Sequence, residues 1–467
     1  MQGADRDPGA GGDTSRRRVL HGTGALAALA ALGGGGYALG SALGLPHDPR
    51  TVVPLSSATV ALAADGTRVP VGGQAGAAAL HPGTRLLADV PAGSAPARRA
   101  EEFLAGAAAW RDRITGASDP TGSTDLSAPS RSAPKISAPE LADSALWDLW
   151  ILSDGLVAPV AGWTSKWRYI WPRDTAFSAV ALARVGHLDR ALDALEHLQR
   201  IQPATGWYEA RYVPGTDRAP DDRPPQFDGT GLVLWAVSEV VEVAGERRGE
   251  VLDRLARLVT TSAALLLEET ADGRRPPPVS PDYWEVRERR VTAGILAATL
   301  AGLRAAATLT QEDRVVHGAE AFAALTREDV AVRGVRRYRR GGGADSGAAF
   351  LDATGHHDLL QSTDLLGLRG ALARPAGGIA PGASWKQDGI SWTPSTSLLA
   401  LALARRGEHE AAGEILDWLA AHRTEAGSLP EKVLFDGRPA ALAPLAWTAA
   451  NVLLACDAQA GTGSDAA

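Results

Sequence analysis

Cysteine is almost absent from this chain, since Cys456 is the only one in 467 residues. A single thiol cannot close an internal disulfide or supply the several sulfur ligands of a metal cluster. Lysine is nearly as scarce, because only four of the 47 basic residues are lysine. The formal net charge is −7. An acidic chain of this kind does not favour nucleic acid as a partner.

Aromatic residues are also few, at 5% of the chain, yet several gather in the stretch from Trp163 to Asp174. This stretch reads W-T-S-K-W-R-Y-I-W-P-R-D and ends in the pair Arg173 and Asp174. Stacked rings can cover the apolar face of a sugar, while arginine donates hydrogen bonds to its hydroxyls and aspartate accepts them. The alternative is an aromatic core strand that ends in a salt bridge.

The N-terminal 45 residues separate positive charge from an apolar run. Ser15 to Leu20 reads S-R-R-R-V-L, and Gly22 to Leu45 follows without a charged residue. The pattern resembles a twin-arginine export signal, which serves proteins that are exported already folded. We therefore expect residues 1–45 to direct export to an extracellular or membrane-anchored location. A retained membrane helix is the alternative, because the run is long enough to span a bilayer.

Residues 46–95 show a short, strand-like pattern. Segments 58–63 and 68–72 flank Asp65-Gly66, a pair that is typical of a hairpin turn. We expect a small β-hairpin appendage here, too short for a full sandwich domain. Residues 115–139 are rich in Ser, Thr, Pro and Ala, which predicts a long flexible loop. We also expect a disordered tail at residues 461–467.

Between residues 96 and 460 the sequence predicts one all-helical domain. Short turns such as Gly186-His187 and Arg406-Gly407 alternate with long loops, which places the long loops on one side. Twelve helices in this order predict a closed ring of two concentric layers, an (α/α)6 barrel. A superhelical solenoid is the alternative, although no fixed-period repeat supports it. The helical segments are expected at 96–114, 140–153, 173–185, 188–201, 229–244, 249–270, 289–308, 311–330, 358–372, 394–405, 408–422 and 444–457.

The long loops hold most of the unusual side chains. One carries Trp207 and ends at Asp228, whose alternative role is the N-cap of the next helix. A later loop reads P-D-Y-W-E and places Glu285 directly after Trp284. A carboxyl group beside an indole is an arrangement that suits a general acid. The alternative for Glu285 is a surface ion pair with a neighbouring arginine.

Two more loop segments carry charge. The segment that contains Glu431 reads L-P-E-K and precedes the last helix. The alternative to a functional role for Glu431 is a solvated ion pair with Lys432. The segment 336–340 reads R-R-Y-R-R, which we interpret as a solvated loop on an acidic protein. No set of residues has the spacing of a metal site or of a cofactor-binding motif. We expect neither a metal nor a cofactor.

Taken in order, the motifs W-R-Y-I-W-P-R-D, D-Y-W-E, and L-P-E-K-V followed by A-P-L-A-W-T resemble glycoside hydrolase family 15. This is the family of glucoamylases, glucodextranases and related trehalases. The segment G-I-S-W-T-P, which contains Trp392, resembles the family's loop into a late helix. The resemblance covers about 140–456. It implies an (α/α)6 barrel and inverting, exo-acting hydrolysis of α-linked glucose, without a metal or cofactor.

The resemblance also implies roles for single residues. Glu285 matches the general acid and Glu431 the general base of an inverting pair, whose carboxyl groups lie about 6.5–9.5 Å apart. Arg173 and Asp174 match the pair that grips the terminal glucose. The further substrate-binding candidates, five from the family pocket and Trp207 and Trp392 from adjoining loops, are Tyr169, Trp171, Trp207, Asp282, Trp284, Trp392 and Trp447.

Two departures from the family pattern leave the substrate open. Val286 follows Glu285 where many members have a second acidic residue, and the large N-terminal β-sandwich of bacterial members is reduced to about 50–91. We expect an exported enzyme that releases glucose from non-reducing ends of short α-glucans. A trehalase or glucodextranase type of activity is one alternative. A catalytically idle barrel that binds an oligosaccharide is another.

Overall fold

The computed structural model describes residues 48–116 and 139–461. The chain divides into two compact units, residues 1–49 with 386–388 and residues 50–385 with 389–467. All described helices and strands belong to the larger unit. The expected export signal at 1–45 lies outside the described residues. So do nearly all of the loop expected at 115–139 and of the tail expected at 461–467.

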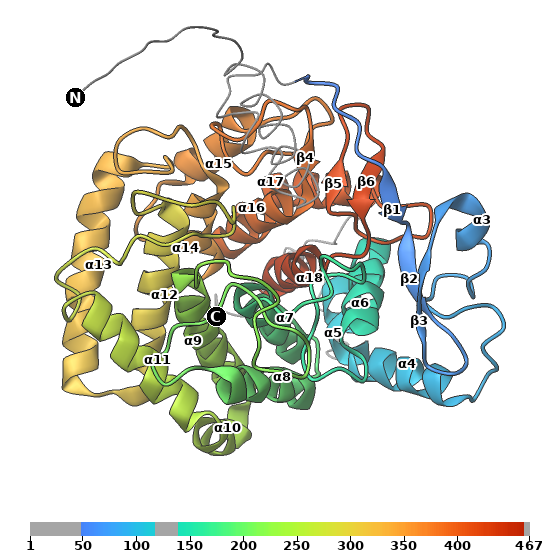
Figure 1. Cartoon of the computed structure of the whole chain (residues 1–467), viewed down its shortest axis with the longest axis horizontal. Coiled ribbons are helices and arrows are strands. Elements are labelled where there is room, and N and C mark those ends of the chain that lie inside the picture. Colours follow the sequence, from blue (N-terminus) through green and yellow to red (C-terminus); the bar gives the residue numbers. More distant parts are fainter. Residues whose placement is uncertain (1–47, 117–138, 462–467) are drawn as a thin grey trace, which may run out of the picture. The chain divides into compact units, whose positions relative to one another are not determined.

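An inner ring of six helical segments forms the centre of the described part (Figure 1). Each segment packs against the next, and the last packs against the first, so the ring is closed. The fourth member consists of the 3-10 turn η2 (Ser346–Ala349) continued by α14. The inner helices are α7 (Pro172–Arg184), α9 (Phe227–Val243), α12 (Ala293–Thr310), α14 (Phe350–Ala353), α16 (Thr393–Arg406) and α18 (Ala446–Gly461).

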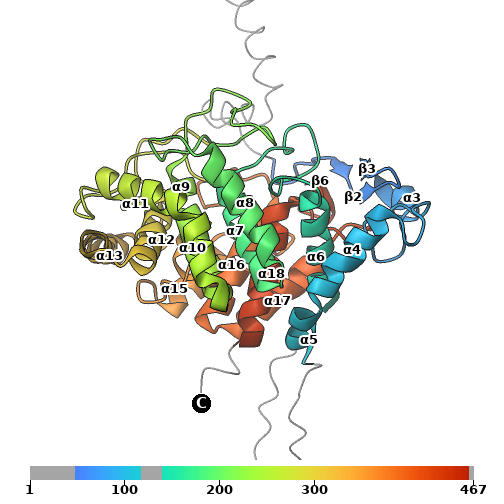
Figure 2. The same ribbon diagram turned by 90° about the horizontal axis from the view of Figure 1, so that it is seen from below.

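In the described residues six further helices pack against this ring as an outer layer. Several of them, such as α8, α11 and α13, are labelled in Figure 2, which shows the barrel from below. Helix α6 packs on α18, α8 on α7 and α9, α11 and α13 on α12, and α15 and α17 on α16. The outer helices are α6 (Pro139–Ser153), α8 (Leu188–Ile201), α11 (Ala256–Glu269), α13 (Asp313–Arg333), α15 (Ser362–Ala371) and α17 (His409–Ala421). The predicted (α/α)6 barrel is confirmed, and the solenoid alternative is wrong.

The remaining elements lie outside the two layers. Among the described residues, β1, β6, β5 and β4 form a four-stranded sheet in that order, in which β1 and β6 are parallel. The predicted hairpin is confirmed as β2 and β3, which pair antiparallel across Asp65-Gly66. These elements are β1 (Leu55–Ser57), β2 (Thr59–Leu62), β3 (Arg68–Val71), α3 (Gly73–Ala77), α4 (Ala95–Gly106), α5 (Ala108–Thr115), η1 (Gly245–Arg247), α10 (Arg248–Arg254), β4 (Ser391–Trp392), β5 (Lys432–Val433) and β6 (Pro439–Leu442).

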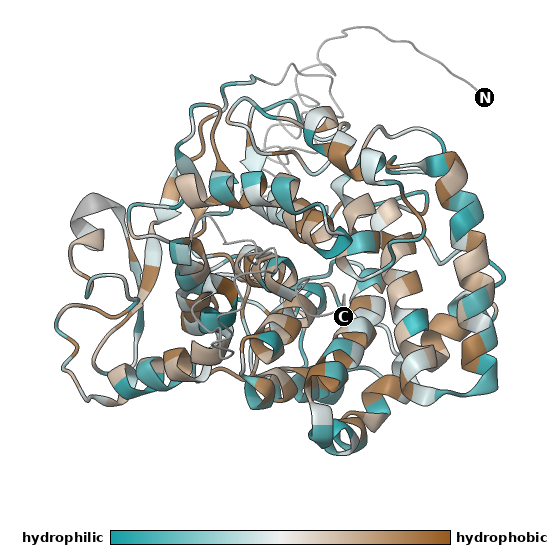
Figure 3. Ribbon diagram, turned by 180° about the vertical axis from the view of Figure 1, so that it is seen from behind, coloured by the Kyte–Doolittle hydropathy of each residue, from teal (hydrophilic) through white to brown (hydrophobic). Residues whose placement is uncertain are grey.

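The inner helices α9, α12 and α18 are buried along most of their length, because they have neighbours in both layers, and brown apolar residues are frequent in the barrel (Figure 3). Small residues let them approach closely. A Cβ atom on Gly231 of α9 would lie 2.1 Å from the carbonyl oxygen of Ala298 on α12, so only glycine fits there. Helix α12 is long and apolar enough to span a membrane, but 72% of that span is buried inside the barrel. The apolar side chains of α12 therefore form part of the hydrophobic core.

One of the twelve expected helices was confirmed as helical but does not belong to the ring. The segment 96–114 is split into α4 and α5, which are not part of the ring. The true twelfth member, η2 with α14, was missed because its eight residues are too few to display a helical period. The expected helix 249–270 is also broken at Leu255, between α10 and α11.

The long loops all lead into inner helices. The connections that lead out of them are short turns after α7, α12 and α16, a longer turn after α14, and η1 with α10 after α9. Gly407 ends α16 with a left-handed φ of 88°, and Gly186 follows α7 with a φ of 101°. Because each short turn reverses the chain, all inner helices begin at the same end of the ring. We call this end, with its long loops, the loop end. It carries every candidate site residue of the sequence analysis.

Candidate functional site

The N-cap positions of the inner helices bring distant sequence segments together at the loop end. Trp171 is the N-cap of α7, Gln226 of α9 and Trp392 of α16. Proline in the first turn of α7 and α16 fixes the direction in which the chain enters each helix. Side chains at these positions and in the following turn therefore lie at the same end of the ring.

Arg173 lies at the centre of this arrangement and is only 4% exposed. It donates hydrogen bonds to Gln226 Oε1 at 3.0 Å and to Asp228 Oδ2 at 2.9 Å. Its Nε lies 3.5 Å from Asp174 Oδ2, and its guanidinium stacks 5.3 Å from the ring centre of Trp447. Asp228 is the second residue of α9 and not its N-cap, so the capping alternative is wrong. It is instead a buried counter-ion of Arg173.

Asp174 is a buried carboxyl in the first turn of α7. Burial raises the pKa of Asp174 to about 6; Arg173 opposes this shift, and the charges of Glu285 and Asp228 add to it. Burial also raises the pKa of Asp228 above its ordinary value. Asp174 Oδ2 accepts no hydrogen bond within the described residues. An uncommitted acceptor of this kind can receive a ligand hydroxyl.

Glu285 ends a tight turn and has a φ of 55°, a left-handed conformation that costs a non-glycine residue about 1–2 kcal/mol. Its Oε1 accepts a hydrogen bond from Trp171 Nε1 and lies 3.9 Å from Arg173 Nη2. Its Oε2 accepts a hydrogen bond from Arg223. Glu285 therefore forms ion pairs with Arg173 and Arg223, which are distant in the sequence, and not with a neighbouring arginine. The indole that donates a hydrogen bond to Glu285 belongs to Trp171, which lies on another loop. It is not the indole of Trp284, the preceding residue in the sequence.

Behind this turn lies Arg337, which is 1% exposed. It donates to Asp282 at 2.9 Å, to Glu288 at 2.6 Å and to Asp345 at 2.7 Å. Burial acts to lower the pKa of Arg337, but the carboxylates outweigh burial and raise it. Its guanidinium also lies 3.6 Å from the ring centre of Trp284. Asp282 is thus a buried counter-ion of Arg337, and its Oδ1 also accepts a hydrogen bond from the backbone N–H of Trp284.

The position of Arg337 corrects the interpretation of segment 336–340. It was expected to be a solvated loop, yet its second residue is among the largest fully buried side chains described. Arg336, Arg339 and Arg340 remain exposed. Nothing in the run R-R-Y-R-R distinguishes one arginine from the others, because the carboxylates that select Arg337 come from other loops.

Glu431 occupies a different environment and is 5% exposed. Its backbone is fixed at both ends, since its N–H donates to Leu442 O at 2.8 Å and its carbonyl accepts from Thr393 N at 3.1 Å. Its Oε1 lies 3.3 Å from Lys432 Nζ, which is itself 4.3 Å from the ring centre of Trp392. Its Oε2 has no hydrogen-bond partner in the described part of the chain. The expected pair with Lys432 exists, but it is buried.

A short series of contacts joins the two glutamates. Glu285 lies beside Arg173, and Arg173 lies over the ring of Trp447. The next residue, Thr448, is 3.0 Å from the hydroxyl of Thr393, which lies 3.2 Å from the carbonyl oxygen of Glu431. These contacts connect Glu285, through Arg173 and the starts of α18 and α16, with the backbone of Glu431.

The aromatic candidates fall into separate groups. Trp284 and Trp392 each contact Trp385 edge-on, at 4.9 and 5.5 Å between ring centres. Trp447 stacks on Phe350 at 6.0 Å and 9°. Trp385 was not singled out from the sequence, although an isolated tryptophan in a glycine-rich loop is a usable signal. Trp207 packs on Phe227 and the hydrophobic core.

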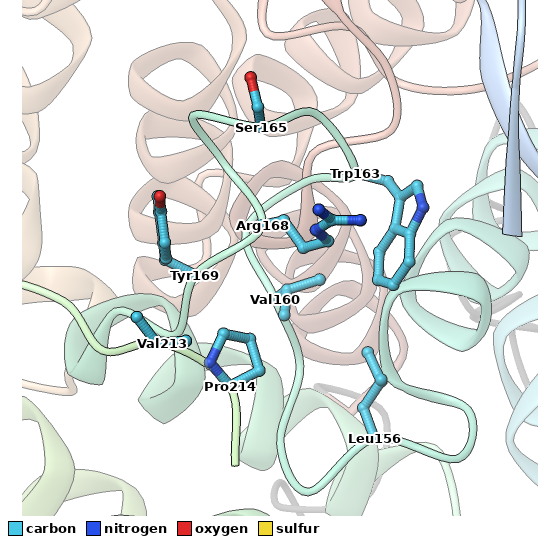
Figure 4. Close-up of a pocket in the computed structure, with 8 residues that line it drawn as sticks. All are labelled: Leu156, Val160, Trp163, Ser165, Arg168, Tyr169, Val213 and Pro214. Atoms are coloured by element: carbon cyan, nitrogen blue, oxygen red, sulfur yellow. The ribbon is translucent and has the colours of Figure 1, made fainter. Parts of the chain in front are cut away.

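Tyr169 links the site to a cavity of about 500 Å³, shown in Figure 4. Its ring lies 6.1 Å from that of Trp171, and Arg211 stacks over it at 4.6 Å. Most of the cavity wall comes from the aromatic stretch and its flanks, and the remainder from the following long loop. The lining residues are Leu156, Val160, Trp163, Ser165, Arg168, Tyr169, Val213 and Pro214.

Several buried polar atoms at the loop end have no hydrogen-bond partner among the described residues. Such groups are costly unless they are satisfied, so those at the loop end mark it as a candidate polar binding site. They come from six different loops or helix starts. These atoms are Arg173 Nε, Asp174 Oδ2, Asp228 Oδ1, Asp282 Oδ2, Trp284 Nε1, Trp392 Nε1, Glu431 Oε2 and Trp447 Nε1.

Comparison with known proteins supports the fold. No protein-family model and no curated protein matches the chain. Among solved structures, a glycosidase variant in complex with glucose is similar with a TM-score of 0.57 and 21% identity, over 68% of this chain and 96% of that one. A bacterial glucoamylase complexed with acarbose has a TM-score of 0.54 and 15% identity, over 69% of this chain and 55% of that one.

A third solved structure is also a glucoamylase. Glucoamylase from Saccharomycopsis fibuligera has a TM-score of 0.52 and 12% identity, over 68% of this chain and 94% of that one. At such identities the likeness concerns the fold. The chain therefore has the six-hairpin barrel that glycosidases of the glucoamylase type share.

Proposed function

We propose that the protein is an inverting, exo-acting glycoside hydrolase that releases glucose from the non-reducing ends of short α-glucans. One observation carries this proposal. Two carboxylates from separate loops lie at the loop end: Glu285 is 3.9 Å from the buried Arg173, which pairs with Asp174, and the buried Glu431 keeps one oxygen without a hydrogen-bond partner in the described residues. A neutral ligand that is rich in hydroxyl groups suits such a mixture of donors, acceptors and aromatic rings.

In the proposed reaction Glu285 is the general acid and Glu431 the general base. Glu285 gives a proton to the glycosidic oxygen as the bond to C1 breaks. Glu431 takes a proton from the water that attacks C1 from the opposite face, so that the α-glucoside yields β-glucose. The uncommitted Oε2 of Glu431 is the acceptor for that water. The step consumes one water and needs no further reactant.

Arg173 and Asp174 hold the terminal sugar in this proposal. The Nε of Arg173 donates to one hydroxyl, and Oδ2 of Asp174 accepts from another. Trp171 and Trp447 border the same space and cover the apolar face of the ring. Buried groups of this kind are easier to reach for the end of a chain than for its middle. This is the basis for proposing exo action.

The test is a substrate panel with purified protein. Maltose, isomaltose and trehalose are incubated separately, and the released anomer is followed by NMR. We expect β-glucose as the first product from at least one of them, and the preferred disaccharide decides between a glucoamylase, a glucodextranase and a trehalase type of activity. Release of α-glucose would sink the inverting assignment. Binding by calorimetry without turnover of any glucoside would instead support a sugar-binding barrel.

We also propose export through residues 1–45, on the strength of the R-R-R and apolar pattern alone. A fusion of residues 1–45 to a reporter that folds before export provides the test. Replacement of Arg16 and Arg17 by lysine should abolish export, because receptors of this pathway recognise the arginine pair. Unchanged export of the lysine variant would contradict the proposal.

A further inference from the structure

Glu285 lies within a short segment whose two ends are bound by one buried arginine. This acid segment begins at Asp282 and ends at Glu288, and Arg337 donates hydrogen bonds to both ends, at 2.9 and 2.6 Å. The guanidinium also lies 3.6 Å from the ring centre of Trp284. Within the described residues Arg337 donates no hydrogen bond to Glu285 itself. It therefore contacts the segment on both sides of Glu285 without contacting the carboxylate.

The acid segment needs a restraint of this kind. The backbone N–H of Glu285 donates to the carbonyl oxygen of Asp282 at 2.8 Å, and that of Trp284 donates to Asp282 Oδ1 at 3.0 Å. Glu285 has a φ of 55°, and a non-glycine residue keeps such a conformation only where its surroundings impose it. Asp282 Oδ1 also accepts from Arg337 Nη2. Loss of the guanidinium would thus let the turn relax and move the carboxyl group of Glu285.

Arg337 is itself fixed by parts of the chain outside the acid segment. Its backbone N–H donates to Gly343 O at 2.9 Å, and its carbonyl oxygen accepts from Ala293 N at 2.8 Å, at the start of α12. Its Nη1 donates to Asp345 at 2.7 Å, and Asp345 is held in turn by the N–H of Gly347. The inner helix α12 and the loop before η2 therefore set the position of the guanidinium.

We propose that Arg337 is a positioning residue for the general acid, because it fixes the point at which Glu285 delivers its proton. The inference rests on the proposed function, in which Glu285 protonates the glycosidic oxygen. The planar guanidinium binds several carboxylates at fixed angles, which the single ammonium group of lysine does not reproduce. Arg337 acts through the acid segment alone and takes no part in the proton transfer.

The experiment compares a substrate that needs a general acid with one that does not. These are the disaccharide preferred in the substrate panel and α-glucosyl fluoride, whose leaving group departs without a proton. For Arg337→Lys we expect kcat on the disaccharide to fall about 10²-fold, which is the effect of misplacing a group by about 1 Å. KM should change little, and kcat on the fluoride should stay close to the wild-type value. A residue that only stabilises the fold would lower both activities alike.

Arg405→Lys is the matched control. Arg405 donates two hydrogen bonds to Glu239, at 3.0 and 2.8 Å, and both lie toward the ends of their inner helices, away from the loop end. This variant should keep the wild-type ratio of the two kcat values.

The double variant Glu285→Gln with Arg337→Lys gives a second readout. On the disaccharide it should be no slower than Glu285→Gln alone, because a positioning residue has no effect once the acid is gone.

The outcomes separate this inference from the function on which it rests. Equal losses on both substrates in Arg337→Lys, or a further loss in the double variant, overturn the role of Arg337 and leave the hydrolase assignment standing. Should Arg337→Lys not fold, Glu288→Gln removes one of the two hydrogen bonds to the acid segment and has to show a smaller loss on the disaccharide alone. Its absence also overturns the inference. If the wild type hydrolyses neither the disaccharides nor the fluoride, the proposed function itself fails, and the inference with it.

Discussion

Glu285 and Glu431 are both carboxylates at the loop end, but their surroundings differ in almost every respect. Glu285 is 23% exposed, has a left-handed backbone and accepts hydrogen bonds on both oxygens. Glu431 is 5% exposed, has a backbone that is hydrogen-bonded to Leu442 and Thr393, and keeps one oxygen without a hydrogen-bond partner in the described residues. One carboxylate is held by side chains from other loops, and the other by its own backbone.

This difference fits two different tasks. A group that has to deliver a proton to a departing aglycone benefits from exposure on the leaving-group side and from partners that can exchange. A group that has to accept a proton from one water benefits from a fixed position and a free lone pair. The environments therefore support the assignment of Glu285 as acid and Glu431 as base. Four experiments test the comparison, and the largest effect concerns the two carboxylates themselves.

Substitution of either glutamate by glutamine should lower kcat about 10²–10⁴-fold with maltose or another natural leaving group. The two variants should separate on α-glucosyl fluoride, whose leaving group needs no proton. Glu285→Gln should recover most of its activity on the fluoride, while Glu431→Gln should not. Steady-state kinetics on both substrates provide the measurement. Recovery by Glu431→Gln in place of Glu285→Gln would reverse the two roles.

Arg337→Met tests the support behind Glu285. The substitution leaves Asp282, Glu288 and Asp345 buried without their common cation, and breaking a buried pair in this way costs about 3–5 kcal/mol of unfolding free energy. Denaturant unfolding of both proteins measures the loss. Arg340→Met, an exposed neighbour, is the control and should change stability by less than about 0.5 kcal/mol. Equal effects of the two substitutions would contradict the buried network.

Asp174 allows a test by pH. Because its folded pKa is raised to about 6 from an ordinary value of 3.8, the folded state binds more protons than the unfolded state between these values. Stability due to this group is therefore present at low pH and is lost as pH rises through about 6. Relative to wild type, Asp174→Asn should gain about 2 kcal/mol of stability between pH 4 and pH 7. A difference that does not vary with pH would contradict the raised pKa.

Lys432→Met should produce the smallest of the four effects. Lys432 lies 3.3 Å from Glu431 and over the ring of Trp392, so its loss removes a charge and a contact without touching the carboxylate. We expect a fall in kcat/KM of roughly tenfold, which corresponds to about 1.4 kcal/mol. Lys432→Arg should retain most of the activity because it keeps the charge. If both variants behave alike, the charge of Lys432 is not what positions Glu431.

The sequence was sufficient to predict the barrel because alternating short and long connections and apolar helices are local features. The hairpin around Asp65-Gly66 was predictable for the same reason. The short fourth inner helix was not, since eight residues around Phe350 do not display a period. The candidate residues at the loop end were also proposed from the sequence. They were found through motifs that follow one another in the order of the resembled family, and not through residue spacing alone.

The partners of those residues were beyond the sequence. Arg337 looks like its neighbours in R-R-Y-R-R, and only the fold brings Asp282, Glu288 and Asp345 around it. Likewise Arg223 lies 62 residues from Glu285, and no local pattern relates them. Asp228 was weighed as a cap because it lies near a helix start, whereas its actual role depends on Arg173 from another helix. Pairings of this kind depend on the tertiary structure and cannot be read from a local sequence pattern.

The common direction of the inner helices has an electrostatic consequence. Each helix places its unpaired N–H groups, equivalent to about half a positive charge, at the end where it begins. All inner helices begin at the loop end, so the peptide backbone itself creates a positive potential there. Asp174 and Asp228 occupy first turns within that potential. The barrel thus favours acidic groups at its mouth, and a chemistry built on clustered carboxylates is one that this scaffold supports before any side chain is chosen.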